Sequence, residues 1–407
     1  MEARRMSRIT QEQKIELENE QNALAFFRQA LAAMPEPRRR QGIRYPLPAV
    51  VTIALMAMVC GCDDAEAMEL WGEANAEWLA GLFKLPHGTP TQDVFLAVFG
   101  AIKPDGFSSV FQAWVDLLSV KVGMQGKHIA VDGKTSRRSL DKAKNRPAIH
   151  TVSAWLCDEG LVLGQRQTDA KSNEITAIPA LLRTLDLTGT TVTIDAMGCQ
   201  TDIVKTIADG GGQCLIAVKD NQPTLHAEIR ETFAQAADHR VRSVDEPPRP
   251  EVAVFEEVDK NHGRVEKRRC ELCRSLDWIS THDRWPQVSF VVRVIRERTV
   301  VAEQKTSTET AYYIGTDANL LVSAAATIIR RHWSVENELH WVLDMAFRED
   351  EARHRARNCA ANFTTLRRFS LGLLKRDPDR KLGIANSRKR AGWDRAYLLR
   401  ILGATQD

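Results

Sequence analysis

The sequence of 407 residues has no long hydrophobic run. Its most apolar segment, Ala49 to Cys62, is shorter than the roughly 20 residues that a membrane-spanning helix needs. The opening segment MEARRMSRIT is rich in arginine and has no apolar core, which argues against a secretory signal peptide. We therefore expect a cytoplasmic protein without a membrane partner.

The eight cysteines form no recognisable disulfide or zinc framework. Cys270 and Cys273 have the C-x-x-C spacing of half a zinc site, but no second pair occurs at the spacing of a zinc finger. Reduced thiols in a cytoplasmic protein are the simpler interpretation. The sequence leaves the role of this pair open.

Neither sign of charge dominates, because the formal net charge is only +3. Lysine and arginine nevertheless concentrate near the C-terminus, where fourteen lie between residues 353 and 400 against three acids. A basic segment on a near-neutral chain favours a polyanionic partner, since phosphate contacts release counterions. A solvated helical face would have the same composition, so charge alone does not decide between the two.

Changes in hydrophobic periodicity divide the chain into four parts. Residues 1–122 carry helical patterns and no strand, which predicts an all-helical N-terminal domain and a candidate DNA-binding one. Residues 123–222 mix strands and helices. A helix and then strand-like alternation follow in residues 223–318, and helical patterns resume in residues 319–407.

The second part has a definite order of elements, which is strand, hairpin, helix, strand, helix and strand. The expected strands are 128–132, 150–156, 161–168, 190–194 and 214–218. One helix ends near Leu185 and another spans 200–209. This order matches the first five strands of a ribonuclease-H-like fold, so the expected fold class is α/β.

Two aspartates directly follow predicted strands. Asp132 ends the first strand and Asp195 ends the fourth. Acids at the ends of adjacent parallel strands suit a two-metal site, in which carboxylates converge on ions roughly 3.5–4 Å apart. A buried acid at such a position must be paired or bind a metal, whereas an exposed one would be an ordinary strand-end cap.

A third acid would come from the helix that contains Glu336, Glu338 and Asp344. Helical periodicity places five apolar residues on one face of this helix, namely Val335, Leu339, Val342, Leu343 and Ala346. Glu336 lies at one edge of that face and Glu338 at the other. Periodicity alone does not choose between them, and an exposed helix acid is the alternative for each.

Four motifs occur in order along the chain: Ala130-Val-Asp-Gly-Lys-Thr135, Thr193-Ile-Asp-Ala-Met-Gly-Cys-Gln200, Ala217-Val-Lys-Asp-Asn-Gln222 and Arg331-His-Trp-Ser-Val-Glu-Asn-Glu-Leu-His-Trp341. They closely resemble motifs of insertion-sequence transposases of the DDE class, and the nearest branch is the H-repeat-associated one. The resemblance extends over nearly the whole chain. Several long motifs in the same order are a much stronger signal than three acids alone.

The resemblance implies a DNA transposase that cleaves transposon ends and joins them to target DNA, with Mg²⁺ as cofactor and Mn²⁺ as a substitute. Its ribonuclease-H-like catalytic core, residues 123–222 and 319–407, would be interrupted by a β-rich insertion and would end in a basic helical tail. The catalytic and metal-binding acids map to Asp132, Asp195 and Glu336. The expected partner is double-stranded DNA, both ends and target, bound by a homo-oligomer.

Related transposases carry a Tyr–Arg–Glu–Lys signature around the glutamate. This chain has Ile329, His332 and Leu343 at the other three positions, so only the glutamate matches. The neighbouring Arg330 and Arg331 could take over the phosphate contacts.

Nine residues are candidate DNA contacts: Lys134, Lys219, His262, Arg264, Arg331, His332, Arg388, Lys389 and Arg390. Solvated side chains are the alternative interpretation for the lysines. Trp278 or Trp285 could stack on a displaced base, although tryptophans more often pack in a core. Glu174 is expected to stabilise a helix start rather than to join the site.

Two other functions are compatible with parts of this pattern. A non-catalytic DNA-binding protein derived from such an element would not need three intact acids. A ribonuclease-H-like nuclease without end specificity would not need the helical N-terminus, the insertion and the basic tail. The sequence does not give the end sequence, the target preference, the transposition pathway or the oligomeric state.

Overall fold

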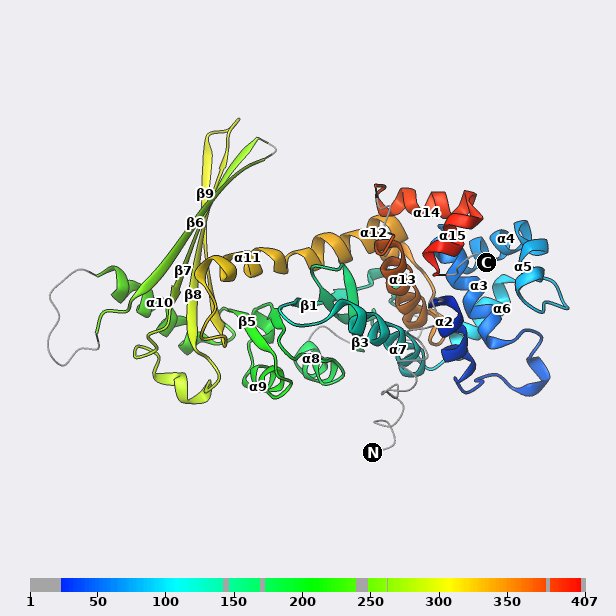
Figure 1. Ribbon diagram of the computed structural model, residues 1–407, viewed down its shortest axis with the longest axis horizontal. Coiled ribbons are helices and arrows are strands. Elements are labelled where there is room, and N and C mark those ends of the chain that lie inside the picture. The colour runs from blue at the N-terminus through cyan, green and yellow to red at the C-terminus, as the bar shows by residue number, and fades with distance from the viewer. Residues whose placement is uncertain are drawn as a thin grey trace.

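The computed structural model describes residues 23–141, 146–168, 173–238, 248–261, 263–377 and 381–403. A nine-stranded sheet runs through its centre, with strand order β3-β2-β1-β4-β5-β9-β8-β7-β6. Figure 1 shows an elongated molecule in which strands β6 to β9 project at one end and the first and last helices of the chain gather at the other. The protein is thus of mixed α/β class, as the sequence predicts.

The N-terminal part is helical, as expected. Its helices are α2 (Ala23–Ala32), α3 (Leu47–Val59), α4 (Ala65–Ala74), α5 (Ala76–Leu82), α6 (Gln92–Ala101) and α7 (Pro104–Val122). Helix α3 is buried on all sides, because α2, α4 and α6 surround it together with helices from the other end of the chain. This complete burial explains the apolar run around residues 49–62.

The C-terminal helices join this same core. They are α13 (Cys359–Lys375), α14 (Ile384–Trp393) and α15 (Arg395–Ile401). Helices α13 and α14 contact α3, and the ring of Phe369 on α13 stacks on that of Phe27 on α2 with centroids 4.7 Å apart. Among the described residues, no single helix is long and apolar enough to cross a membrane, whereas one pair that bends by 92° (Gln92–Ala101 and Pro104–Asp116) passes on length and composition.

Five strands lie where periodicity predicts them: β1 (His128–Thr135), β2 (His150–Leu156), β3 (Leu161–Thr168), β4 (Thr191–Ile194) and β5 (Gln213–Val218). Strand β1 pairs antiparallel with β2 and parallel with β4, and β4 pairs parallel with β5. Helices α8 (Glu174–Leu182) and α9 (Thr201–Asp209) connect these strands and pack against each other.

The residues between β5 and α11 extend this sheet. They form α10 (Pro223–Ala237), β6 (Val252–Asn261), β7 (Arg264–Cys273), β8 (Phe290–Val300) and β9 (Lys305–Gly315). Strand β9 pairs antiparallel with β5, so the inserted strands continue the central sheet and cover what would otherwise be an open edge. Gly315 is required there, since a Cβ atom would lie 2.0 Å from Cζ of Phe290.

Helix α11 (Val322–His332) links the inserted strands to the first five. It contacts β6 and β7 as well as β1 and β4, and Figure 1 shows it running along the molecule toward α12. A single π-helical turn, Val335–His340, separates it from α12 (Trp341–Phe347). Arg348 then adopts a left-handed conformation with φ 49°, which ends the helix.

A fully buried ion pair ties α13 to the segment after α12. Nη1 of Arg368 lies 2.7 Å from Oε1 of Glu349, and both side chains are completely inaccessible. The Arg368 Nε also donates to Oγ of Ser153 on β2 at 3.4 Å. Burial alone would raise the pKa of Glu349, but the charges of Arg368, Arg367 and Lys134 outweigh it and lower that pKa.

We predict that Arg368→Met lowers the free energy of unfolding by about 3–5 kcal/mol, because it leaves the Glu349 carboxylate buried without its partner. The double variant Arg368→Met/Glu349→Leu should recover most of this loss, since no buried charge remains. Urea unfolding of the three proteins measures both effects. A double variant as unstable as the single one would show that the charge pair is not what stabilises this region.

Candidate active site

The register of β1 and β4 brings the two predicted aspartates to one edge of the sheet. Val131 pairs with Ile194 in these parallel strands. Asp132 and Asp195 are the next residues on each strand, so they follow the same point of the ladder. Parallel neighbours end at the same edge of a sheet, which is why two positions far apart in sequence become neighbours here.

Asp132 is largely buried, with 20% of its side chain exposed. Its Oδ1 accepts a hydrogen bond from the Gly133 N–H at 2.8 Å, and its Oδ2 lies 3.5 Å from Nδ1 of His340. Burial raises the pKa of Asp132 to about 7, the Gly133 N–H opposes this rise, and the charges of Asp195, Glu336 and Glu174 add to it. The acids of the site are therefore near enough to destabilise one another's charged forms.

Asp195 is exposed at the edge where Asp132 is buried. Its Oδ1 accepts from the Met197 N–H at 3.1 Å and so caps the short 3-10 helix Ala196–Gly198. Asp195 is thus a strand-end cap, which is one of the two interpretations that the sequence allows. Its charge also contributes to the raised pKa of Asp132.

The helix acids differ in what they bind. Glu338 accepts from Nζ of Lys375 at 3.2 Å, and Asp344 accepts from Nζ of Lys134 at 2.7 Å. Glu336 is exposed, and its charge is one of those that raise the pKa of Asp132. Since lysines hold Glu338 and Asp344, the arrangement favours Glu336 as the acid that faces the aspartates.

The π-helical turn sets the direction of these side chains. The Trp341 N–H donates to the Glu336 carbonyl five residues earlier, which inserts one extra residue into that turn. The turn contacts β1, and both Glu336 and His340 act on Asp132 from it. Single π turns inside α-helices occur frequently at functional sites.

Close packing on one side of β1 requires glycine beside Asp132. A Cβ at position 133 would lie 2.3 Å from Nε2 of His150 and 2.5 Å from Oε1 of Glu174. These two side chains form a buried pair with a 2.5 Å N–O distance. Successive strand residues face opposite sides of a sheet, so the Glu174–His150 pair supports the strand on the face away from the Asp132 side chain.

Comparison with known proteins identifies the family. The family described as "Transposase DDE domain" matches residues 123–373, and one described as "DDE_Tnp_1-associated" matches residues 28–115. The chain belongs to the DDE transposases. The resemblance seen in the motifs is thereby confirmed, including its H-repeat-associated branch.

Two of the three relatives described next match nearly the whole chain, and the third matches 60% of it. Two proteins of Escherichia coli (strain K12) are named "H repeat-associated putative transposase": YhhI is 34% identical over 92% of this chain and 97% of its own, and YbfD is 35% identical over 60% of this chain and 92% of its own. YncI of Escherichia coli O157:H7 is 31% identical over 93% of this chain and 94% of its own.

The acids suit a hard divalent cation. Carboxylate oxygens are ligands that Mg²⁺ prefers, and a cation would stabilise the Asp132 carboxylate, whose pKa is raised by burial and then by the charges of neighbouring acids. In the part of the chain that the structure describes, no group of three or more His, Cys, Asp or Glu side chains converges closely enough to hold a metal. Asp195 and Glu336 are exposed, whereas the Asp132 side chain is only 20% exposed.

Two of the expected DNA contacts, Lys134 and His332, have partners inside the protein. Lys134 is buried and paired with Asp344. Nδ1 of His332 lies 2.8 Å from Oγ1 of Thr193, and burial lowers the pKa of this histidine to about 4, so it is neutral at pH 7. These contacts suggest that Lys134 and His332 hold neighbouring side chains in place rather than bind phosphate.

Arg388 is the clearest correction. It is 3% exposed, and its Nη2 donates to the Met58 carbonyl at 2.7 Å and to Oδ1 of Asp63 at 2.6 Å. Its guanidinium also lies 4.0 Å from the centre of the Phe347 ring. The expectation that Arg388 contacts DNA is wrong, because the side chain fastens α14 to the ends of α3 and α12.

The other candidates remain predictions. Lys219, Arg264 and Lys389 are exposed, Arg390 is half-buried near Asp394, and Arg331 donates to the Cys157 carbonyl at 2.8 Å. His262 lies outside the described residues. Of the tryptophans considered, Trp285 is buried and fits the core interpretation.

Sequence reasoning missed two residues near the site. His340 lies beside Asp132, and Trp333 is 43% exposed just before the π turn. The spacing of Glu336 and His340, one helical turn apart, was the available signal for the histidine. No periodic signal distinguishes an exposed tryptophan from a buried one at the end of a helix.

The raised pKa of Asp132 predicts how stability depends on pH. Its pKa rises from 3.8 in the unfolded chain to about 7 in the folded one, so the carboxylate destabilises the metal-free protein increasingly as pH rises from about 4 to about 7. Asp132→Asn should therefore unfold at higher urea concentration than the wild type at pH 8, with little difference at pH 4. A less stable variant at pH 8 would mean that the carboxylate has a structural role.

Proposed function

We propose that this protein is an active transposase that cleaves DNA at transposon ends, frees a 3′-hydroxyl group and joins it to target DNA. The proposal rests on the pairing of β1 with β4. Asp132 and Asp195 directly follow the paired residues Val131 and Ile194, and the charge of Glu336 contributes to the raised pKa of Asp132. The family supplies the reaction class.

Asp132, Asp195 and Glu336 would hold two divalent cations, Mg²⁺ or its substitute Mn²⁺. Such ions polarise phosphoryl oxygen and lower the pKa of bound water at the site of an in-line displacement. Asp132 must lose its proton for this, so its raised pKa makes cation binding pH-dependent. Glu336 is exposed and so can reach both a cation and the DNA backbone.

The same sheet order supports a ribonuclease-H-like core. Strands β3-β2-β1-β4-β5 combine an antiparallel β1–β2–β3 meander with parallel β1, β4 and β5. We propose that residues 123–222 and 319–407 form this core, with residues 223–318 as the insertion and 1–122 as a helical domain that binds DNA.

Double-stranded DNA is the proposed partner, with transposon ends and target both bound by a homo-oligomer in the cytoplasm. The basic residues that remain candidates are Lys219, Arg264, Arg331, Lys389 and Arg390. The buried Asp132 favours catalysis over a purely DNA-binding role, because a carboxylate with a raised pKa reduces stability and serves no purpose in binding an anion.

We predict that Asp132→Asn and Glu336→Gln each reduce metal-dependent cleavage of end-containing duplexes by at least about 100-fold. Loss of residues that merely support metal ligands already costs 10–100-fold. DNA binding without metal should be nearly unchanged, because basic residues supply it. Gel assays with purified protein measure both quantities.

Glu338→Gln is the matched control for this experiment. It removes a carboxylate two residues from Glu336 on the same π turn, where it binds Lys375. This variant should keep cleavage activity. Loss of cleavage in Glu338→Gln with activity retained in Glu336→Gln would reverse the assignment.

A further inference from the structure

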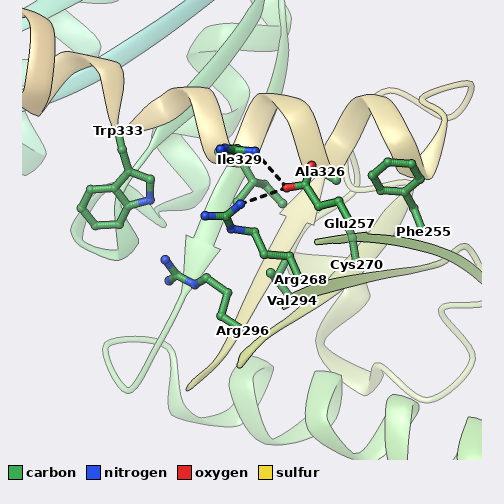
Figure 2. Close-up of a pocket in the computed structure, with 10 residues that line it drawn as sticks. Phe255, Glu257, Arg268, Cys270, Val294, Arg296, Ala326, Ile329 and Trp333 are labelled. Atoms are coloured by element: carbon green, nitrogen blue, oxygen red, sulfur yellow. Dashed lines mark hydrogen bonds and ion pairs between the residues drawn. The ribbon is translucent and has the colours of Figure 1, made fainter. Parts of the chain in front are cut away.

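A groove lies between α11 and the inserted strands β6, β7 and β8. Its charged lining comes from Glu257, Arg268, Arg296 and Arg330, and Ile329 and Trp333 form part of the wall from α11. Figure 2 shows Arg268 and Arg296 extending side by side toward the end of α11 that carries Trp333.

The two strand arginines stand directly opposite each other. Arg268 on β7 is the register partner of Arg296 on β8. Like charges at directly opposite positions of an antiparallel pair destabilise a sheet. Carboxylates that pair with the two guanidinium groups, or an anion that lies between them, would offset this repulsion.

Acids on β6, β7 and β9 pair with the two arginines. Arg268 pairs with Glu257 on β6 at 3.2 Å and with Glu266 at 2.7 Å. Arg296 pairs with Glu309 on β9 at 3.3 Å, a contact weakened by solvent since the Glu309 side chain is 71% exposed. The arginine side chains themselves are only 17% and 25% exposed, so water screens them little.

The geometry suits a phosphate group. A guanidinium has five N–H donors in a planar fork, and the bond to Glu309 uses one of those on Arg296. Arg268 already uses Nη1 on Glu257 and Nη2 on Glu266, so Arg296 keeps more donors free for a phosphodiester, which guanidinium binds in bidentate fashion. The low exposure strengthens this attraction.

The position of the groove points to DNA as the source of the phosphate. Trp333 lines the groove and lies three residues before Glu336, which is about 5 Å along a helix axis. A duplex whose backbone reaches Glu336 would therefore lie close to the Trp333 end of the groove.

We propose that Arg268 and Arg296 together bind one backbone phosphate of the DNA held at the catalytic acids. This inference rests on the proposed function, since it takes the bound polyanion to be the transposase substrate. The contact carries no base information, so it fixes the position of the duplex rather than recognising its sequence.

The test compares three variants in metal-free binding to a fluorescent duplex, measured by anisotropy at several salt concentrations. Arg296→Gln removes one fork, and Arg296→Lys keeps the charge without the fork. Lys267→Gln is the matched control, because Lys267 is exposed on the same strand as Arg268 and faces the other side of the sheet.

Arg296→Gln should lower the magnitude of the log–log salt slope by about 0.9, which shrinks the affinity loss between 50 and 200 mM salt about 3.5-fold. Arg296→Lys should keep the slope but bind more weakly, and Lys267→Gln should match the wild type. The melting temperature of DNA-free Arg296→Gln should not fall, because the repulsion with Arg268 is relieved.

An unchanged slope in Arg296→Gln, with wild-type protein that binds DNA, would overturn the inference and leave the proposed function intact. Failure of the wild-type protein to bind any duplex would contradict the proposed function itself. A rise in melting temperature with millimolar inorganic phosphate that is lost in Arg296→Gln, together with an unchanged DNA salt slope in that variant, would show that the groove takes a free anion instead of DNA.

Discussion

The site depends on one largely buried carboxylate, that of Asp132, whose ionised form the protein destabilises. Burial and three neighbouring acids all disfavour its ionised form, and the hydrogen bond from Gly133 only partly opposes them. A buried charge of this kind must be paired or bind a cation, and the proposed function assigns it a cation. Strand β4 supplies a second acid through its register, the π turn supplies a third, and the Glu174–His150 pair fixes the strand from the opposite face.

Lysine and arginine side chains pair with the other acids of this region. Lys134 holds Asp344, Lys375 holds Glu338, and Arg368 holds Glu349. The basic C-terminal region therefore contributes to the fold at positions that composition assigns to nucleic acid. Its helices share a core with the N-terminal ones, so the two ends of the chain pack against each other.

The features that could be predicted from the sequence are those that depend on local hydrophobic periodicity. Strands β1 to β5 and the positions of Asp132 and Asp195 follow from short apolar runs that end in an acid. The choice between Glu336 and Glu338 depends on a π turn and on a lysine from α13, neither of which periodicity contains. The burial of Arg388 depends on carbonyl groups from α3 and α12, which are 330 and 42 residues away in sequence. The pairing of β9 with β5 is likewise a long-range event that no local pattern encodes.

The central claim is that Asp132, Asp195 and Glu336 together bind the catalytic cations. Crystals grown with Mn²⁺ and an end-containing duplex, measured at the manganese absorption edge, test this directly. The account predicts anomalous peaks within coordination distance of carboxylate oxygens from all three residues, roughly 3.5–4 Å apart if two ions bind. Peaks held instead by Glu338 or Asp344, with Glu336 turned away from the aspartates, would contradict it.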